Sequence, residues 1–368
     1  MRVGFDATPL LGPRTGVGTY TDRLVNALAH PANGDVELVA TPFSARGTHD
    51  LAAQLPPGAR IAGRRLPARA LMAAWSRTDW PPIELLTGRV DVFHGTNFVA
   101  PPARRAGLVV TIHDLAYLHR PADVAAASLR YQTLVPSALR RGAVVCAVSN
   151  AMAAEIIDAY DLDPQRVHTT SLGVDATWFA DQTPTGPQLV HALPDRYVIA
   201  VGTIEPRKNI AALVDAYRLA ADRSIELPPL VLVGAQGWGA QLDTAGVPEH
   251  LIIRTGHLPA QDLRYAVSRA AALAFPSQYE GFGLPPLEAL ALGVPVLATD
   301  LAVTREVLSD QAVFVDSTSA EALVEGLRRV LDDPPGTPQT RRQHAGQFTW
   351  ERCATKTLGA YVHAATAR

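Results

Sequence analysis

The chain has little of what a secreted, metal-binding or membrane-spanning protein needs. Cysteine occurs at only two of 368 positions, Cys146 and Cys353, without the spacing of a zinc site, so we expect two free thiols in a reducing compartment. No apolar run approaches the roughly 18–20 residues that span a bilayer, and charge interrupts the N-terminal segment so early that we expect no signal peptide. The net charge of −2 gives no general attraction to nucleic acid.

Lysine is also scarce. Of the 33 lysines and arginines, only Lys208 and Lys356 are lysines, a bias that follows from genomic base composition. Lys208 stands in the motif GTIEPRKN at 202–209, where a compact and mobile ammonium is useful. Composition alone leaves open whether Lys208 is functional or is simply a surface lysine that escaped the bias.

What the chain does have is a long alternation of apolar strands and amphipathic helices. The first strands are expected at Arg2–Asp6, Val36–Ala40, Val90–His94, Leu108–His113, Ala143–Val148 and Val167–Ser171. After an irregular stretch at 174–196, further strands are expected at Tyr197–Gly202, Leu230–Gly234, Leu251–Thr255, Leu273–Pro276, Val294–Thr299 and Ala312–Val315. Such alternation predicts an α/β protein with parallel sheets covered on both faces.

The length favours two domains rather than one core. We therefore predict two Rossmann-like domains, an N-terminal one at 1–185 and a C-terminal one at 186–347. The remaining segment, 348–368, is expected to be a helix that packs back on the N-terminal domain.

The segment Ser277–Asp300 carries the strongest chemical signal. Glu280 and Glu288 flank two glycines and the pair Pro285-Pro286, which suits the first turn of a helix expected at Leu287–Leu292. Glycines allow close approach to the backbone, and a helix N-terminus attracts an anion. The pattern predicts a ligand that is a phosphate at one end and a polyol at the other, which describes a nucleotide sugar.

Motifs along nearly the whole chain carry a family resemblance. They are TGVGTY at 15–20, DVFHGTNF at 91–98, TIHDLAYLHRP at 111–121, AVSNAMAAEI at 147–156, LGVD at 172–175, GTIEPRKN at 202–209, EGFGLPPLEALALGVPVLATD at 280–300 and FTWERCA at 348–354. In this order they resemble the retaining, nucleotide-sugar-dependent glycosyltransferases of family 4 (group 1), and among these the mannosyltransferases. The resemblance implies the GT-B fold, in which two Rossmann-like domains face each other across a deep cleft. The N-terminal domain would bind the acceptor and the C-terminal domain the nucleotide sugar.

The resemblance also implies roles for individual residues. Arg207 and Lys208 would clamp the donor diphosphate, Glu288 would bind the ribose and Glu280 would lie near the hexose. Thr203 replaces a further cation found in some members, which leaves two cations in the clamp. The expected donor-binding residues are Gly16, Gly202, Arg207, Lys208, Glu280, Gly281, Phe282, Gly283, Leu284 and Glu288.

The catalytic residues implied by the resemblance are His113, Asp114, Arg207, Lys208 and Glu280. We favour front-face displacement with retention, in which the departing phosphate helps to deprotonate the acceptor hydroxyl, over a covalent intermediate on Glu280. No cofactor and no metal are expected. Asp161 and Asp163 resemble a metal-binding DxD pair, but the following Pro164 favours a capping role.

The predicted function is transfer of a hexose, mannose first, from a nucleotide-diphosphate sugar to a glycan or lipid-linked acceptor in surface polysaccharide or glycolipid synthesis. The alternatives are a UDP-glucose or rhamnose donor, an epimerase or phosphorylase of the same fold, and a non-catalytic nucleotide-sugar-binding protein. We expect a cytoplasmic protein and no nucleic-acid partner.

A basic segment at 59–77 suggests that the protein also contacts the inner face of the cell membrane. It contains Arg60, Arg64, Arg65, Arg69 and Arg77, together with Leu71, Met72 and Trp75. The competing interpretation is a solvated arginine face whose apolar side lies in the core.

Overall fold

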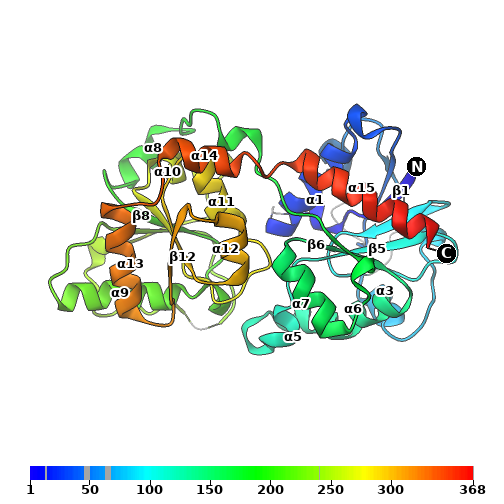
Figure 1. The fold of residues 1–368 in the computed structure, drawn as a ribbon, viewed down its shortest axis with the longest axis horizontal. Helices are drawn as coiled ribbons and strands as arrows, with labels where there is room; N and C mark the ends of the chain where they lie inside the picture. The colour runs from blue at the N-terminus through cyan, green and yellow to red at the C-terminus, as the bar shows by residue number, and fades with distance from the viewer. Residues whose placement is uncertain (13–14, 45–49, 63–67, 240, 368) are drawn as a thin grey trace. The chain divides into compact units, whose positions relative to one another are not determined.

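The computed structural model describes residues 1–12, 15–44, 50–62, 68–239 and 241–367, which form two compact units (Figure 1). Unit 1 comprises Met1–His119, Ala126–Gly173 and Thr349–Arg368, and unit 2 comprises Arg120–Ala125 and Val174–Phe348. The division after Gly173 lies earlier than the predicted 185/186, because the connecting segment packs on unit 2. There Thr185 donates from its backbone N–H to Asp262 Oδ1 at 2.8 Å.

In the described part of unit 1, a seven-stranded parallel sheet has the order β3-β2-β1-β4-β5-β6-β7. The strands are β1 (Arg2–Asp6), β2 (Glu37–Thr41), β3 (Arg60–Ile61), β4 (Val92–Gly95), β5 (Gly107–Ile112), β6 (Val144–Ala147) and β7 (Val167–Thr169). Six of them follow the expected strands closely. β3 was not expected, because two exposed residues leave no apolar pattern to detect.

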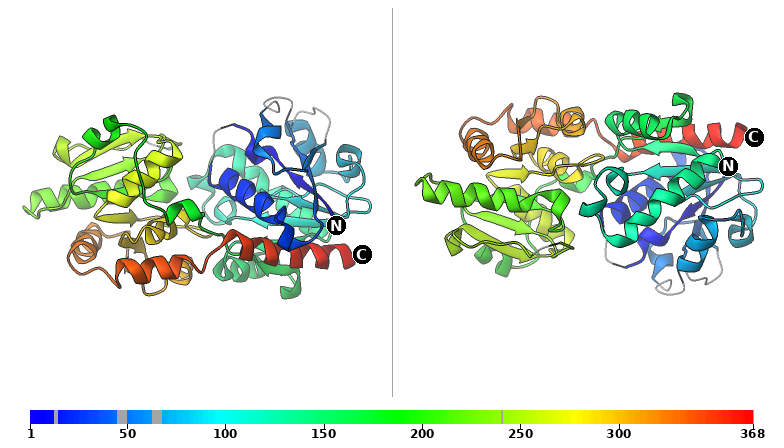
Figure 2. Two further views of the ribbon diagram at one scale, coloured as in Figure 1. Left: turned by 90° about the horizontal axis from the view of Figure 1, so that it is seen from above. Right: turned by 90° about the horizontal axis from the view of Figure 1, so that it is seen from below.

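Helices cover this sheet, and the last of them comes from the end of the chain. They are α1 (Gly16–Leu28), α2 (Leu51–Gln54), α3 (Ala68–Trp75), α4 (Glu84–Thr87), α5 (Ala116–His119), α6 (Tyr131–Arg140), α7 (Asn150–Tyr160) and α15 (Trp350–Thr366). α15 packs along α1 and against β5, β6 and β7 (Figure 2). Its buried face includes Cys353 and Tyr361, and Cys353 and Cys146 are both buried free thiols.

Among the residues described in unit 2, six parallel strands have the order β10-β9-β8-β11-β12-β13. They are β8 (Val198–Val201), β9 (Leu230–Val233), β10 (Ile252–Gly256), β11 (Ala272–Phe275), β12 (Val296–Thr299) and β13 (Ala312–Val315). This order and the first six strands of unit 1 both match the doubly wound Rossmann sheet, which confirms the predicted fold class. The order reverses between β8 and β11, and ligands of such sheets bind where the carboxyl ends of strands meet this reversal.

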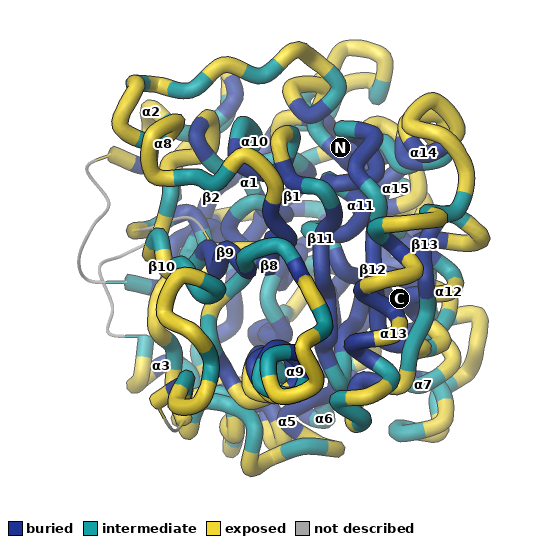
Figure 3. The backbone as a smooth tube through the Cα atoms, turned by 90° about the vertical axis from the view of Figure 1, so that its left-hand side faces the viewer, coloured by how far each residue is buried: buried dark blue, intermediate teal, exposed yellow. Residues whose placement is uncertain are grey.

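The helices of unit 2 lie on both faces of its sheet. They are α8 (Pro187–Ala192), α9 (Ile210–Asp222), α10 (Ala260–Arg269), α11 (Leu284–Ala291), α12 (Ala302–Leu308), α13 (Ala320–Asp332) and α14 (Pro338–Ala345). α9 and α13 bury Leu213, Tyr217 and Leu327 against alternate residues of the strands. Strands such as β11 and β12 are buried throughout, whereas the outer faces of the helices are exposed (Figure 3). Continuous burial explains their unbroken apolar sequences.

α11 begins earlier than its sequence predicted, at Leu284 instead of Leu287. Both prolines fit within the first turn, where backbone N–H groups have no partner inside the helix. Gly283 precedes the helix with a φ of 98°, a left-handed conformation that favours glycine. The loop can therefore turn sharply into the helix at Gly283, three residues after Glu280.

The basic segment folds with its apolar side inward. Leu71 and Trp75 of α3 are buried, and Trp75 donates from Nε1 to the carbonyl of Pro81 at 2.9 Å. This matches the interpretation of a solvated arginine face and removes Trp75 as an exposed membrane anchor. Arg64 and Arg65 lie outside the described residues. Among the helices that the structure describes, none has the length and apolar character needed to cross a bilayer.

Candidate functional site

A tight turn after β8 presents the two predicted clamp cations. Gly202 has a φ of 144° and Asn209 has a φ of 54°, so both ends of the turn use left-handed backbone, which glycine and asparagine tolerate best. Asn209 also donates from Nδ2 to the carbonyl of Ser317 at 2.9 Å. The turn holds Arg207 and Lys208 at the carboxyl edge of the sheet, next to the strand-order reversal.

Glu280 joins both cations from the loop after β11. Its Oε1 lies 2.6 Å from Lys208 Nζ and its Oε2 lies 2.8 Å from Arg207 NH1. Arg207 NH2 reaches Glu205 Oε1 at 2.8 Å, and Lys208 Nζ lies 5.1 Å from the centroid of the Phe275 ring. We call Glu205, Arg207, Lys208 and Glu280 the ion cluster. Its side chains are largely buried, with Arg207 and Lys208 each only 15% exposed.

Electrostatics keep the Glu280 carboxylate ionised. Burial raises its pKa, but Lys208 and then Arg207 outweigh burial and lower the pKa to about 2. Burial raises the pKa of Glu205 despite the attraction of Arg207 and Lys208. Two cations and two carboxyl groups make the cluster nearly neutral. Any anion that binds to Arg207 and Lys208 would therefore have to compete with Glu280 for them.

The loop between β11 and α11 is fixed to the clamp turn through its backbone. The N–H of Gln278 donates to the carbonyl of Arg207 at 2.9 Å, and Arg207 NH1 donates to the carbonyl of Tyr279 at 2.9 Å. The two segments joined in this way carry the predicted donor residues of unit 2. These are Gly202, Arg207, Lys208, Glu280, Gly281, Phe282, Gly283, Leu284 and, half-buried within α11, Glu288.

His113 directly follows β5 in unit 1. Its Nε2 lies 2.8 Å from the carbonyl of Thr96, which can only accept, so Nε2 carries the proton and Nδ1 carries the lone pair. The rings of Tyr20 and Phe98 contact the imidazole edge-on, with centroids 4.9 and 5.6 Å away. Burial lowers the pKa of His113, against the opposing effects of the Thr96 carbonyl and Asp114, so the neutral ring predominates at pH 7.

The other predicted residues of unit 1 have simpler surroundings. Asp114 Oδ1 accepts from the N–H of Ala116 at 3.0 Å and so holds the start of α5. Gly16 is the exposed first residue of α1, where a Cβ would meet no atom of the described residues within 4 Å. Thr15 caps this helix by accepting from the N–H of Gly18 at 3.3 Å. Gly16, His113 and Asp114 belong to unit 1 and the remaining site residues to unit 2.

Sequence reasoning missed several residues that support the site. Glu205 lies inside the GTIEPRKN motif, and its charge beside a proline was the available signal. Tyr20 ends the TGVGTY motif, but nothing in the sequence shows that its ring contacts His113. Gln278 precedes Glu280 by two positions, and its backbone contact with Arg207 joins residues 71 apart in the sequence.

A buried hydrogen-bonded chain lies behind His113. Tyr20 Oη lies 2.8 Å from Thr111 Oγ1, which lies 2.7 Å from Nε2 of His94. His94 Nδ1 lies 2.8 Å from Oη of Tyr361 on α15. Burial lowers the pKa of His94 to about 3, with a smaller effect from His113. The chain thus links α1, β5, β4 and α15 through neutral groups.

We expect His94 to make unit 1 sensitive to acid. An unfolded histidine gains a proton below pH 6.5, whereas folded His94 stays neutral down to about pH 3, so the unfolding free energy decreases as the pH falls through this window. Between pH 7 and 5 His94 should contribute a loss of about 2 kcal/mol. Urea unfolding of the wild type and of His94→Gln at both pH values measures it. An equal pH dependence in the two proteins would contradict this assignment.

Side chains of types that commonly bind metals have other partners in this structure. Asp163 caps the 3₁₀ turn Pro164–Arg166 by accepting from the N–H of Gln165 at 2.9 Å, which confirms the capping interpretation. His119 lies 3.1 Å from Glu155, and His94 is engaged by two hydroxyl groups. Within the described ranges, no group of three or more histidine, cysteine, aspartate or glutamate side chains is arranged to hold a metal ion.

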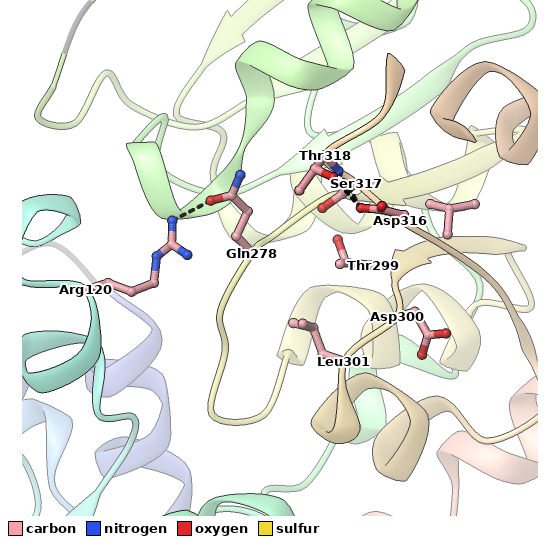
Figure 4. Close-up of a pocket in the computed structure, with 9 residues that line it drawn as sticks. Arg120, Gln278, Thr299, Asp300, Leu301, Asp316, Ser317 and Thr318 are labelled. Carbon is pink, nitrogen blue, oxygen red and sulfur yellow. Dashed lines mark hydrogen bonds between the residues drawn. The ribbon is translucent and has the colours of Figure 1, made fainter. Parts of the chain in front are cut away.

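A pocket of about 420 Å³ lies in unit 2 (Figure 4). Residues that follow β11, β12 and β13 line it, together with Arg120. They are Arg120, Gln278, Thr299, Asp300, Leu301, Val315, Asp316, Ser317 and Thr318. Arg120 NH2 donates to Gln278 Oε1, which joins one wall of the pocket to the loop that carries Glu280.

Comparisons with known proteins cover both halves of the chain. The family Glycosyl transferases group 1 matches residues 182–348, and Glycosyltransferase Family 4 matches residues 14–178. O-antigen chain mannosyltransferase B of Escherichia coli is 30% identical over 98% of this chain and 99% of its own length. The MMP alpha-(1->4)-mannosyltransferase of Mycolicibacterium hassiacum is 26% identical over 75% of this chain and 71% of its own length.

Solved structures agree on the fold. Sucrose-phosphate synthase from Thermosynechococcus elongatus has a TM-score of 0.73 and 18% identity over 100% of both chains. A glycosyltransferase from Rickettsia africae has a TM-score of 0.68 and 14% identity over 100% of this chain and 99% of its own. These likenesses confirm the GT-B fold that the motifs implied. With two matching family patterns and a full-length relative at 30% identity, the chain belongs to the group 1 glycosyltransferases of family 4.

Proposed function

We propose that the chain transfers mannose from GDP-mannose to a hydroxyl group of a glycan or lipid-linked acceptor, with retention of configuration, in surface polysaccharide synthesis. One observation carries the proposal: the buried Arg207–Lys208–Glu280 cluster at the strand-order reversal of unit 2. Two fixed cations at this point suit a diphosphate leaving group. Relatives named as mannosyltransferases, one of them alike over its full length, support mannose as the sugar.

Donor binding would exchange the partners of Arg207 and Lys208 in the ion cluster. In the free protein Glu280 neutralises Arg207 and Lys208, which keeps two buried cations paired. When the diphosphate binds, its oxygens take over contacts to the cations, and the Glu280 carboxylate becomes available to sugar hydroxyls. As negative charge grows on the leaving phosphate, the same cations stabilise it.

The reaction we propose forms and breaks bonds on one face of the sugar. The bond from C1 to the β-phosphate oxygen breaks, and the acceptor oxygen bonds to C1 from the same side. The acceptor proton passes to the departing phosphate, so GDP leaves with that proton. Neutral His113, with a lone pair on Nδ1, can accept a hydrogen bond from a substrate hydroxyl.

The proposal includes no metal and no other cofactor, because two side-chain cations can supply the charge that a divalent ion gives other transferases. Transfer should therefore proceed at an unchanged rate in excess EDTA. A rate that collapses in EDTA and returns with Mg²⁺ or Mn²⁺ would contradict this part of the proposal.

A nucleotide panel tests the donor. Ligands that bind only the folded protein raise its unfolding temperature by mass action, so GDP should raise it more than UDP, dTDP or ADP at equal concentration. A larger shift with UDP or dTDP would favour the glucose or rhamnose alternative. Binding of GDP without any turnover of GDP-mannose would favour a binding protein without catalytic activity.

Glu288 should matter for nucleotide affinity. Replacement of Glu288 by alanine removes the carboxylate assigned to the ribose, and loss of a charge-assisted hydrogen bond of about 1.5–3 kcal/mol weakens binding some tenfold to hundredfold. Titration calorimetry with GDP measures the change. The matched control is Glu325→Ala on α13, where the carboxylate is exposed. Equal GDP affinities in both variants would contradict the ribose assignment.

We also propose action at the inner face of the cell membrane, where lipid-linked acceptors lie. The arginines at 59–77 would supply the contact with anionic headgroups. Liposome cosedimentation should decrease in a variant carrying Arg64→Ser and Arg65→Ser. A protein that binds liposomes equally well with and without these arginines would rule out this segment as the contact.

A further inference from the structure

The pocket of unit 2 has the position of a ligand site but contains none of the ion cluster. Its walls come from the carboxyl ends of β11, β12 and β13, the edge at which doubly wound sheets bind ligands. Its volume of about 420 Å³ lies within the range of small-molecule sites. Gln278 and Ser317 bond to Arg207 and Asn209 respectively, so both walls are fixed to the clamp turn.

Two hydroxyl groups in this pocket are buried without a hydrogen-bond partner. Ser317 is 1% exposed and Thr299 is 7% exposed, and neither Ser317 Oγ nor Thr299 Oγ1 has a partner within the part of the chain that the structure describes. Figure 4 shows both side chains among the residues that line the pocket. Buried hydroxyl groups are normally satisfied, so an unmet pair in one pocket indicates a missing polar occupant.

The charges of the lining disfavour an anion. Asp300 is held by Arg305, with Nε–Oδ1 and NH2–Oδ2 distances of 2.5 and 2.6 Å, and this pairing lowers its pKa. Asp316 accepts from the N–H and hydroxyl of Thr318 at 2.9 and 2.7 Å, which likewise lowers its pKa. Both carboxylates are therefore ionised at pH 7, and Arg120 is the one lining cation among the described residues.

Hydroxyl groups, carboxylates, an amide and a guanidinium together match a ring that carries several hydroxyl groups. Each sugar hydroxyl can both donate and accept a hydrogen bond, so it can pair with the hydroxyl groups of Thr299 and Ser317. The apolar surfaces of Leu301 and Val315 can contact the C–H faces of such a ring.

We propose that this pocket binds an uncharged sugar unit of the acceptor glycan, with Thr299 and Ser317 as its buried hydrogen-bonding partners. The inference rests on the proposed glycosyltransferase function and adds a site for carbohydrate outside the diphosphate clamp. The donor sugar remains assigned to the loop that contains Glu280.

Ligand-observed NMR with methyl α-D-mannopyranoside tests the proposal on the full chain. Thr299→Val and Ser317→Ala each remove one hydroxyl group at nearly constant volume, and we expect each to weaken binding about tenfold. Ser268→Ala is the matched control, because that hydroxyl lies on α10 and donates to the carbonyl of Tyr265 at 2.7 Å. Glu280→Gln should leave binding in the pocket unchanged.

Thermal unfolding separates a ligand-binding role from a structural one. Because both hydroxyl groups are unpaired in the free protein, Thr299→Val and Ser317→Ala should leave the unfolding temperature unchanged or raise it. A lower unfolding temperature with unchanged sugar binding would show a structural role and overturn the proposal. Sugar binding that is lost only in Glu280→Gln would place the sugar on the donor loop and would also overturn it.

Titration of GDP in the same variants distinguishes the two proposals. Thr299→Val and Ser317→Ala should bind GDP as the wild type does. If the wild type binds GDP but not the mannoside, the pocket assignment fails and the donor proposal stands. If the mannoside binds with the expected pattern and GDP does not bind, the donor proposal fails and the pocket assignment stands.

Discussion

Replacing Lys208 by methionine should lower kcat/KM for GDP-mannose about 10²–10³-fold, the range found when one group that stabilises a developing anion is removed. Lys208 Nζ lies 2.6 Å from Glu280 and its side chain is only 15% exposed, so solvent does not screen its charge as it would at a surface. Methionine keeps most of the chain length without the ammonium. Steady-state kinetics of GDP release measure the effect.

The sequence supplies a matched control for this experiment. Lys356, the other lysine of the chain, is exposed on α15, and Lys356→Met should leave kcat/KM within about twofold of the wild type because surface substitutions have small effects. Lys208→Arg keeps the charge and should recover part of the rate. If Lys208→Met and Lys356→Met have equal activity, Lys208 does not belong to a diphosphate clamp.

Replacing Glu280 by glutamine should separate binding from catalysis. Transfer should slow about 100-fold, because the carboxylate that we assign to the sugar hydroxyls loses its charge. GDP should bind as tightly as before or more tightly, since a neutral amide competes less well than a carboxylate for Arg207 and Lys208. Calorimetry with GDP and initial rates with GDP-mannose give the two quantities.

Glu205→Gln is the matched control for Glu280→Gln. It removes a carboxyl group from the same ion cluster, but one that contacts Arg207 and not Lys208. We expect a smaller loss of rate than in Glu280→Gln. The opposite pattern, in which Glu280→Gln loses GDP binding and keeps its kcat, would mean that Glu280 serves the nucleotide and not the transferred sugar.

The pH dependence of transfer follows from the same cluster. With a pKa of about 2, Glu280 stays ionised from pH 4 upward, so its titration should not shape the rate profile between pH 5 and 9. The contrary result is a wild-type rate that falls as the pH drops through about 6, with no such fall in Glu280→Gln. It would show that Lys208 and Arg207 do not lower the pKa of Glu280 as the structure indicates.

The sequence predicted the parts of the fold that burial dictates. Strands β1 and β13 have the expected bounds, because each is a short apolar run between clear breaks. The two-residue strand β3 and the division at Gly173 were not predictable in this way. The first has no apolar pattern, and the second depends on which unit the connecting segment packs against.

The sequence predicted residues for the candidate site but not the contacts between them. The spacing of Glu280 and Glu288 and the pair Arg207-Lys208 marked two segments of unit 2 that the structure brings into contact. That Glu280 pairs with both cations in the free protein depends on a contact between residues 72 positions apart in the chain. The contact of His94 with Tyr361 spans 267 positions, and no local pattern marks such a distant partner.

Proton NMR of GDP-mannose during its slow hydrolysis by the purified protein tests the central claim most directly. Water can replace the acceptor, and the anomer of mannose that appears first reports the stereochemistry before mutarotation mixes the two forms. We expect GDP and α-mannose from the wild type, with Lys208→Met slower by about 10²–10³-fold. Absence of GDP release, β-mannose as the first product, or equal rates in the two proteins would contradict the account.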